Sequence, residues 1–214
     1  MMNRIFRPGG LALTETAAKA ASLSTDTPIL DIGCGTGSSL KHLHQIYGCP
    51  ITGIDLSATC IASAKKSVPE GTFLQADASA LPFADASFTA VFLECVLCLT
   101  EHPLTALTEA SRVLTSGGTI IISTLSRLQG ASLLEEGCVC LNHLSSALIE
   151  RNFTDIQITD RKQDLIQFCA DAIFCYGSIS AYIEHASRTL GGAVVSCNIS
   201  PKKTGYHLIT AKNR

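Results

Sequence analysis

Short hydrophobic runs alternate along the chain with longer segments that carry hydrophobic residues at helical spacing. The short runs predict strands and the longer segments predict helices. The expected strands are 29–32, 51–55, 72–75, 88–93, 119–123, 154–158 and 206–211. The expected helices are 11–23, 38–47, 58–67, 104–114 and 141–150, with a helical region at 163–190. Strands separated by single helices require crossover connections, so the pattern predicts a doubly wound, mostly parallel α/β sheet.

The length of 214 residues is typical of one domain with a sizeable core. We therefore expect residues 1–214 to form a single domain. The pattern becomes looser after residue 123, and we expect 124–205 to include a small helical cap or insertion.

Composition narrows the range of partners. Only 16% of the residues are charged, the formal net charge is -2, and basic residues adjoin only in isolated pairs. This disfavours nucleic-acid binding, which needs a basic surface. No window approaches the ~18 consecutive apolar residues of a membrane span, and no apolar segment of a signal peptide follows the basic start. We expect a cytoplasmic protein whose ten cysteines are mostly thiols. Nothing in the pattern indicates an oligomeric state.

A glycine-rich loop stands where the first strand meets the next helix, and it reads Asp31-Ile32-Gly33-Cys34-Gly35-Thr36-Gly37. In α/β sheets ligands bind beyond the carboxyl ends of the strands, and glycines let the backbone approach them closely. A dinucleotide fingerprint would have its third glycine where Ser38 stands, which disfavours a nicotinamide-dependent oxidoreductase. The acid at Asp31 suits a ligand with a positive amino group.

Acidic residues also follow the second and third strands. Asp55, followed by Leu56, stands about 20 residues after the loop, the spacing at which a carboxylate reaches ribose hydroxyls. Asp77, followed by Ala78, is placed to accept a hydrogen bond from an adenine amine. The alternatives are that Asp55 caps the next helix and that Asp77 is a turn residue.

Four segments, taken in order, resemble the successive motifs of the class I S-adenosylmethionine-dependent methyltransferases. They are Leu30-Asp31-Ile32-Gly33-Cys34-Gly35-Thr36-Gly37, Gly53-Ile54-Asp55-Leu56-Ser57, Ala76-Asp77-Ala78-Ser79-Ala80-Leu81-Pro82-Phe83 and Arg112-Val113-Leu114-Thr115-Ser116-Gly117-Gly118. The resemblance covers about residues 29 to 123. It departs from the family at Thr89, often an acid there, and at Thr115-Ser116, usually Lys-Pro.

This resemblance implies a seven-stranded sheet with an antiparallel last strand, which 206–211 can supply. It also implies S-adenosylmethionine as cofactor, without a metal. The cofactor-binding residues would be Asp31, Gly33, Cys34, Gly35, Gly37, Asp55, Leu56, Asp77, Ala78 and Glu94. In related enzymes the segment before the first helix folds over the cofactor, so Arg7 would meet the methionine carboxylate or an anionic acceptor; a solvated tail is the alternative.

The acceptor of the methyl group should lie over the end of the fourth strand, at Glu94 to His102. This segment lacks the Asn- or Asp-Pro-Pro-aromatic motif of enzymes that methylate nucleic acids or protein amides, which favours a small-molecule acceptor. Methyl transfer is an in-line displacement that needs mainly alignment and exclusion of water. A non-catalytic module that binds S-adenosylmethionine is therefore a competing hypothesis.

The candidate catalytic residues are Cys95, Cys98 and His102. The histidine would act as a general base for an acidic acceptor, or is simply a loop residue before Pro103. The thiols would bind trivalent arsenic together with a third sulfur from Cys138, Cys140, Cys169 or Cys175, as in arsenite methyltransferases, or are small buried hydrophobic residues.

Overall fold

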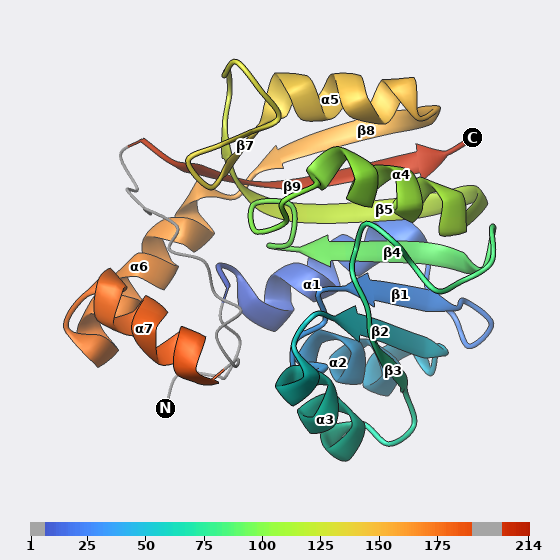
Figure 1. Cartoon of the computed structure of the whole chain (residues 1–214), viewed down its shortest axis with the longest axis horizontal. Coiled ribbons are helices and arrows are strands. Elements are labelled where there is room, and N and C mark those ends of the chain that lie inside the picture. Colours follow the sequence, from blue (N-terminus) through green and yellow to red (C-terminus); the bar gives the residue numbers. More distant parts are fainter. Residues whose placement is uncertain (1–6, 190–202) are drawn as a thin grey trace.

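The computed structural model describes residues 7–189 and 203–214, and a mixed β-sheet lies at its centre (Figure 1). The strands are β1 (Ile29–Ile32), β2 (Ile51–Asp55), β3 (Thr72–Gln75), β4 (Phe88–Glu94), β5 (Leu114–Arg127), β6 (Leu134–Glu135), β7 (Cys138–Cys140), β8 (Phe153–Asp160) and β9 (Gly205–Asn213). The helices are α1 (Gly10–Ala18), a 3-10 turn (Lys19–Ala21), α2 (Ser38–Tyr47), α3 (Ala58–Ser67), α4 (Pro103–Val113), α5 (Leu141–Glu150), α6 (Lys162–Tyr176) and α7 (Ile179–Thr189).

Five parallel strands form the part of the sheet that carries the sequence motifs, in the order β3-β2-β1-β4-β5. Next to β5 lies β9, which runs antiparallel to it, and β8 pairs antiparallel with β9. The predicted doubly wound sheet of mostly parallel strands, with 206–211 as an antiparallel strand, is therefore confirmed.

The sheet also contains two strands that the hydrophobic pattern did not predict. β5 continues to Arg127, four residues beyond the predicted end at Ser123, and its last residues pair in parallel with β7. β6 pairs antiparallel with β7, so the segment around Cys138 and Cys140 forms a short β-ribbon. The two strands have only two and three residues, too few for a periodic pattern to be visible in the sequence.

Helices cover both faces of the sheet. Crossovers between parallel strands are right-handed as a rule, and the strand order reverses between β1 and β4. This places α2 and α3, which connect β1, β2 and β3, on one face of the sheet and α4, which connects β4 and β5, on the other. α1 packs against α2, and α5 against α4 and β8. The core between these layers is apolar, and the central strands β1 and β4 are buried along nearly their whole length.

The helices α6 and α7 lie to one side of these layers (Figure 1). Within 124–205, the end of β5 and all of β6, β7, α5 and β8 belong to the sheet or its helical layer, and residues 190–202 lie outside the described residues. Among the described helices, none alone has the length and hydropathy of a membrane span. α6 and α7 reach that composition only as a pair that bends by 81°.

Candidate functional site

The glycine-rich loop is fastened to the end of β2 by backbone hydrogen bonds. The amides of Gly33 and Cys34 both donate to the carbonyl oxygen of Ile54, at 2.8 and 2.9 Å. The amide of Gly35 donates to Oδ2 of Asp55 at 2.9 Å. The loop between β1 and α2 therefore lies beside the carboxyl end of β2, and the predicted residues of both motifs are brought together.

Three glycines of this loop have a positive φ, with values of 73° at Gly33, 54° at Gly35 and 78° at Gly37. This left-handed backbone favours glycine. A Cβ at Gly33 would lie 2.4 Å from Cγ2 of Val96, in the segment after β4, whereas a Cβ at Gly35 would have no atom within 4 Å. The loop is thus closely packed at Gly33 and open at Gly35.

The carboxylate of Asp55 is held by two backbone amides. Its Oδ2 accepts from Gly35, and its Oδ1 accepts from the amide of Ser57 at 2.8 Å. The N-cap of α3 is Ser57, whose hydroxyl accepts the amide of Cys60, so Asp55 itself is not the capping residue. Each carboxylate oxygen keeps an acceptor site, and the adjacent Leu56 is 65% exposed.

Asp77 forms a tight turn after β3. Its Oδ1 accepts hydrogen bonds from both the amide and the hydroxyl of Ser79 at 2.7 Å, and these bonds lower the pKa of the exposed Asp77. His102 is also exposed, and its charge contributes a smaller lowering of the same pKa. The structure therefore places His102 near Asp77. Ala78 is buried against the core.

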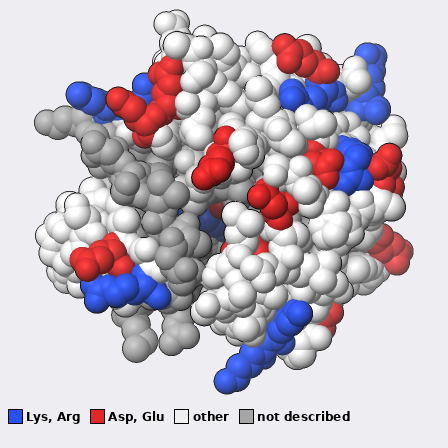
Figure 2. Space-filling model, viewed as in Figure 1, with Lys and Arg blue, Asp and Glu red and all other residues white. Residues whose placement is uncertain are grey.

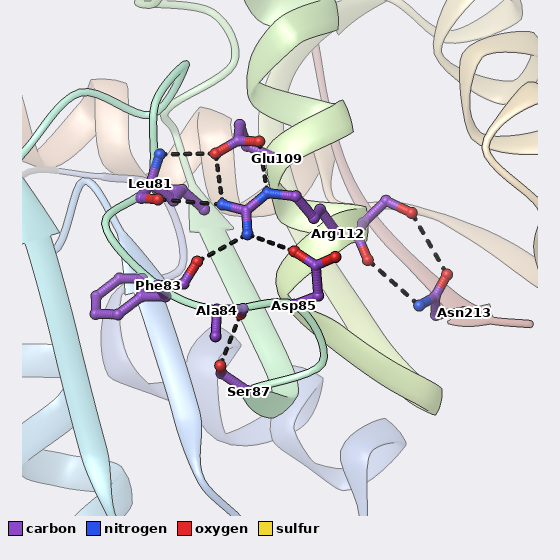
Figure 3. Close-up of polar contacts among 9 residues, drawn as sticks. Leu81, Phe83, Ala84, Asp85, Ser87, Glu109, Arg112 and Asn213 are labelled. Carbon is purple, nitrogen blue, oxygen red and sulfur yellow. Dashed lines mark hydrogen bonds and ion pairs between the residues drawn. The ribbon is translucent and has the colours of Figure 1, made fainter.

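Arg112 of α4 fixes the loop that follows Asp77, as Figure 3 shows. Its guanidinium donates to the carbonyl oxygens of Phe83 and Leu81, at 2.7 and 3.1 Å, and pairs with Asp85 at 2.8 Å. Glu109, paired with Arg112 at 2.7 Å, accepts the amide of Leu81 at 2.8 Å. Arg112, the first residue of the fourth sequence motif, thus holds the loop of the third motif, residues 76–83, in place.

A buried cluster of polar side chains lies at the end of β4. Nη2 of Arg7 lies 2.8 Å from Oε2 of Glu94, and both side chains are more than nine-tenths buried. The hydroxyl of Ser39 donates to Oε2 at 2.8 Å and that of Thr14 to Oε1 at 2.9 Å, while Arg7 also donates to Thr14. Arg7, among the first described residues before α1, is therefore held at the end of β4 and is not part of a solvated tail. Phe6 lies outside the described residues.

Asp31 lies beside this cluster and is 3% exposed. Burial, the charge of Glu94 and, to a lesser extent, that of Asp55 raise the pKa of Asp31 well above its usual range, and Arg7 opposes the shift. Among the described residues, Oδ1 of Asp31 and Nη1 of Arg7 are buried without a hydrogen-bond partner. An acid and a guanidinium in this state fit the ammonium and the carboxylate of an amino acid, which is the methionine part of S-adenosylmethionine.

The thiol of Cys34 is turned into the core. A Cβ on Gly53 would lie 2.7 Å from its sulfur, and burial raises the pKa of Cys34 far above the usual value. Only the backbone of Cys34 remains available to a ligand.

On the other side of Glu94, Cys95 connects β4 to β5 and β9. Its amide donates to the carbonyl oxygen of Ser123 at 2.7 Å, and its sulfur lies 3.4 Å from the hydroxyl of Tyr206. That hydroxyl, fully buried, donates to the hydroxyl of Ser123 at 3.1 Å. Burial is the main cause that raises the pKa of Tyr182 in α7, and the charges of Tyr176 and Cys95 add to it. A half-buried thiol and two tyrosines from β9 and α7 thus lie near the place predicted for the acceptor.

The described residues do not assemble the third sulfur proposed for arsenic. No group of three or more His, Cys, Asp or Glu side chains in residues 7–189 and 203–214 is arranged to hold a metal ion. Cys138 lies near Thr204 and Cys140 near the carbonyl of Leu128, while Cys175 is exposed.

Charged side chains on the face drawn in Figure 2 occur singly or in small mixed groups. In the described part of this face, basic side chains form no continuous stripe.

Sequence reasoning did not identify Tyr206, Ser123 and Tyr182. The sequence pattern places Tyr206 and Ser123 in predicted strands and gives no sign of a functional role. Tyr182 belongs to no recognisable motif. Ser123 meets Cys95 through the pairing of β4 with β5, and Tyr206 does so because β9 inserts beside β5. Tyr182 comes near Cys95 through α7, so Tyr206 and Tyr182 depend on contacts between distant parts of the chain.

Comparison with known proteins adds three results. A family described as "Methyltransferase domain" matches residues 30–122. The chain is 40% identical over 119 residues to the uncharacterized methyltransferase YodH of Bacillus subtilis, a match that covers 53% of this chain and 50% of that protein. It is 29% identical over 219 residues to the O-methyltransferase cnsE of Penicillium expansum, a match that covers 95% of this chain and 78% of that protein. The chain thus spans about half the length of the first relative and more than three quarters of the second.

Among solved structures, the geranyl diphosphate C-methyltransferase of Streptomyces coelicolor, in complex with Mg²⁺, geranyl diphosphate and S-adenosyl-L-homocysteine, superposes with a TM-score of 0.75. The sequence identity is 17%, and the superposition covers 95% of this chain and 79% of that chain. At this identity the likeness concerns the fold.

Proposed function

Because the chain belongs to the class I S-adenosylmethionine-dependent methyltransferases, we propose that it transfers a methyl group from S-adenosylmethionine to a small-molecule acceptor. The observation that carries the proposal is the pair of buried, partnerless atoms, Oδ1 of Asp31 and Nη1 of Arg7. A zwitterionic amino acid satisfies both at once, whereas a pyrophosphate would bring negative charge next to Asp31 and Glu94.

The residues that follow β1, β2 and β3 fit the rest of the cofactor. Asp55, oriented by two backbone amides, accepts the ribose hydroxyls, and the exposed Leu56 covers the adenine. Asp77 accepts the adenine amine, with Ala78 beside it and the loop held by Arg112. Gly35 leaves the space that the ligand needs next to the backbone.

The bound cofactor supplies a methyl group activated by a sulfonium. The protein then has to align an acceptor with that methyl group and keep water away. The cysteine and tyrosines near the end of β4 are the groups that support an acceptor site there, with Cys95 facing it and Cys98 behind. The exposed His102 lies near Asp77, at the adenine end, so the geometry gives no support to its role as a base. The name of cnsE favours oxygen as the atom methylated.

Calorimetric titration with S-adenosylmethionine, S-adenosylhomocysteine and NAD tests the cofactor. We expect binding of the first two and not of NAD. Asp55→Ala should weaken binding by about 10- to 150-fold, because a buried hydrogen bond to a charged group contributes roughly 1.5–3 kcal/mol. Asp26→Ala, at an exposed loop position, is the control and should bind normally.

Turnover with a panel of hydroxyl and carboxyl acceptors separates an enzyme from a binding module. Methylated product supports the proposed reaction, whereas tight cofactor binding without product from a broad panel would favour the non-catalytic module. Unchanged affinity in a folded Asp55→Ala variant would contradict the assigned site.

A further inference from the structure

Two cysteines at the end of β4, separated by two residues in the sequence, lie next to each other in space. Cys95 and Cys98 flank Val96 and Leu97, in a turn closed by a 2.8 Å hydrogen bond from the amide of Leu99 to the carbonyl of Val96. The Cys98 thiol lies 3.5 Å from the carbonyl oxygen of Cys95 and also hydrogen-bonds to the Cys95 sulfur. Cys95 has φ of 60°, a conformation that is strained for a residue with a side chain.

The two cysteines differ in exposure, and the pKa of the Cys95 thiol is lowered. Cys95 is half-buried and Cys98 is 4% exposed. The hydrogen bond from Cys98 is the main cause that lowers the pKa of Cys95, and Tyr206 and the positive charge of Arg7 add to it, against burial and the charge of Glu94. The lowered pKa raises the fraction of Cys95 present as thiolate, the form that attacks a disulfide.

Other cysteines show the opposite behaviour. Burial raises the pKa of Cys34, Cys49, Cys60 and Cys169, which keeps these thiols protonated and unreactive. A half-buried cysteine whose thiol has a lowered pKa, with a second thiol hydrogen-bonded to its sulfur, is the arrangement of a redox site.

We propose that Cys95 and Cys98 form a reversible dithiol–disulfide site that is oxidised by a low-molecular-weight disulfide such as oxidised glutathione. The Cys95 thiolate attacks one sulfur of the glutathione disulfide and releases one glutathione thiolate, which takes up the proton that Cys95 lost. The Cys98 sulfur, as its proton leaves, then attacks the Cys95 sulfur of the mixed disulfide and releases the second glutathione. The protein loses two hydrogens and two glutathione thiols form, so the step is balanced.

The position of this site gives oxidation a structural effect. Val96, between the two cysteines, packs directly on Gly33 of the glycine-rich loop. A disulfide also removes the Cys95 sulfur as a hydrogen-bonding thiol for Tyr206. We therefore expect oxidation to shift Val96 against the glycine-rich loop and to loosen Tyr206 on the neighbouring side.

The test treats the full-length reduced protein with oxidised glutathione and maps disulfides by peptide mass spectrometry. We expect a Cys95–Cys98 link that dithiothreitol reverses. In Cys98→Ser the mixed disulfide should persist at Cys95, because the resolving thiol is missing, and in Cys95→Ser position 98 should stay unmodified. Cys175→Ser, which removes an exposed cysteine of α6, is the control and should still form the link.

Wild-type protein in which glutathione modifies Cys175 while Cys95 and Cys98 remain thiols would overturn the proposal. So would a Cys98→Ser variant that carries no glutathione at Cys95. The wild-type result does not depend on the folding of any variant. These readouts need neither cofactor nor acceptor, so they are independent of the proposed methyl transfer.

Discussion

Arg7 and Glu94 form a buried ion pair across 87 positions of the sequence, with 2.8 Å between Nη2 and Oε2. Removing one partner of such a pair leaves an uncompensated buried charge, which costs about 3–5 kcal/mol. We expect Arg7→Met to lower the free energy of unfolding by about that amount in denaturant titration, and a double variant with Glu94→Gln to recover part of it. Arg188→Met, which breaks an exposed pair with Glu184, should cost less than about 1 kcal/mol. Equal losses in the two arginine variants would contradict the importance of the buried pair.

Alanine substitutions at three glycines distinguish the effect of backbone strain from the effect of filling space. These glycines are Gly33, Gly35 and Gly117. All three have a positive φ, so alanine at each should cost roughly 1–2 kcal/mol of stability. Gly33→Ala should cost more, because its Cβ would meet Val96, whereas Gly35→Ala should mainly abolish cofactor binding. Gly117→Ala, also in open space but in β5 at a distance from the loop in the sequence, should bind normally. Thermal unfolding together with calorimetric titration measures both effects, and normal binding by Gly35→Ala would show that the open space is not part of the pocket.

Arg112→Lys tests whether the loop from Ala78 to Phe83 must be held in place. Lysine cannot reproduce the planar fork that contacts Leu81, Phe83 and Asp85 together, so the loop should loosen and cofactor affinity should fall about 10-fold, or ~1.4 kcal/mol. Arg151→Lys is the matched control, because Arg151 makes a similar set of hydrogen bonds between α4 and α5. The same loss in both variants would indicate general destabilisation.

Cofactor affinity should depend on the ionisation of Asp31. Burial and Glu94 raise the pKa of the free protein's Asp31, with a smaller contribution from Asp55 and opposition from Arg7. A bound ammonium favours the ionised form, so binding below that pKa releases a proton, and affinity rises with pH until Asp31 is ionised in the free protein. Cofactor affinity should be measured below about pH 7.5, where the α-amino group of the cofactor is mostly protonated.

Titrations in two buffers with different heats of ionisation measure this proton release. Asp31→Asn should bind more weakly and release no proton from this site. The same proton release in wild type and Asp31→Asn would assign it to another group.

The parts of the structure that could be predicted from the sequence are those set by local pattern. α2 and α3 have the predicted bounds of 38–47 and 58–67, since glycine or proline turns end them and hydrophobic spacing defines them. The sequence also predicted that the loop from Gly33 to Gly37 and the side chain of Asp55 lie together. Their spacing along the chain is a local pattern that can be recognised without the structure.

The remaining features depend on long-range packing. Arg7 could not be assigned to Glu94 from the sequence, because nothing near Arg7 distinguishes a folded segment from a solvated one. Tyr206 becomes a neighbour of Cys95 only through the pairing of β9 with β5. The ribbon of β6 and β7 forms because β5 runs past its predicted end and offers pairing partners there.

The pairing of β8 with β9 determines how the sequence that connects these two strands can vary. Asp160 and His207 are opposite each other in the sheet, so residues 161–204 form the connection between two adjacent antiparallel strands. The entropy lost in closing such a connection grows only with the logarithm of its length. Added length in this connection therefore costs little loop-closure entropy, whereas substitutions in α6, which packs against β9 with Leu165, Phe168 and Ala172 in the core, also lose packing energy. The connection can thus vary in length while α6 remains tied to the sheet.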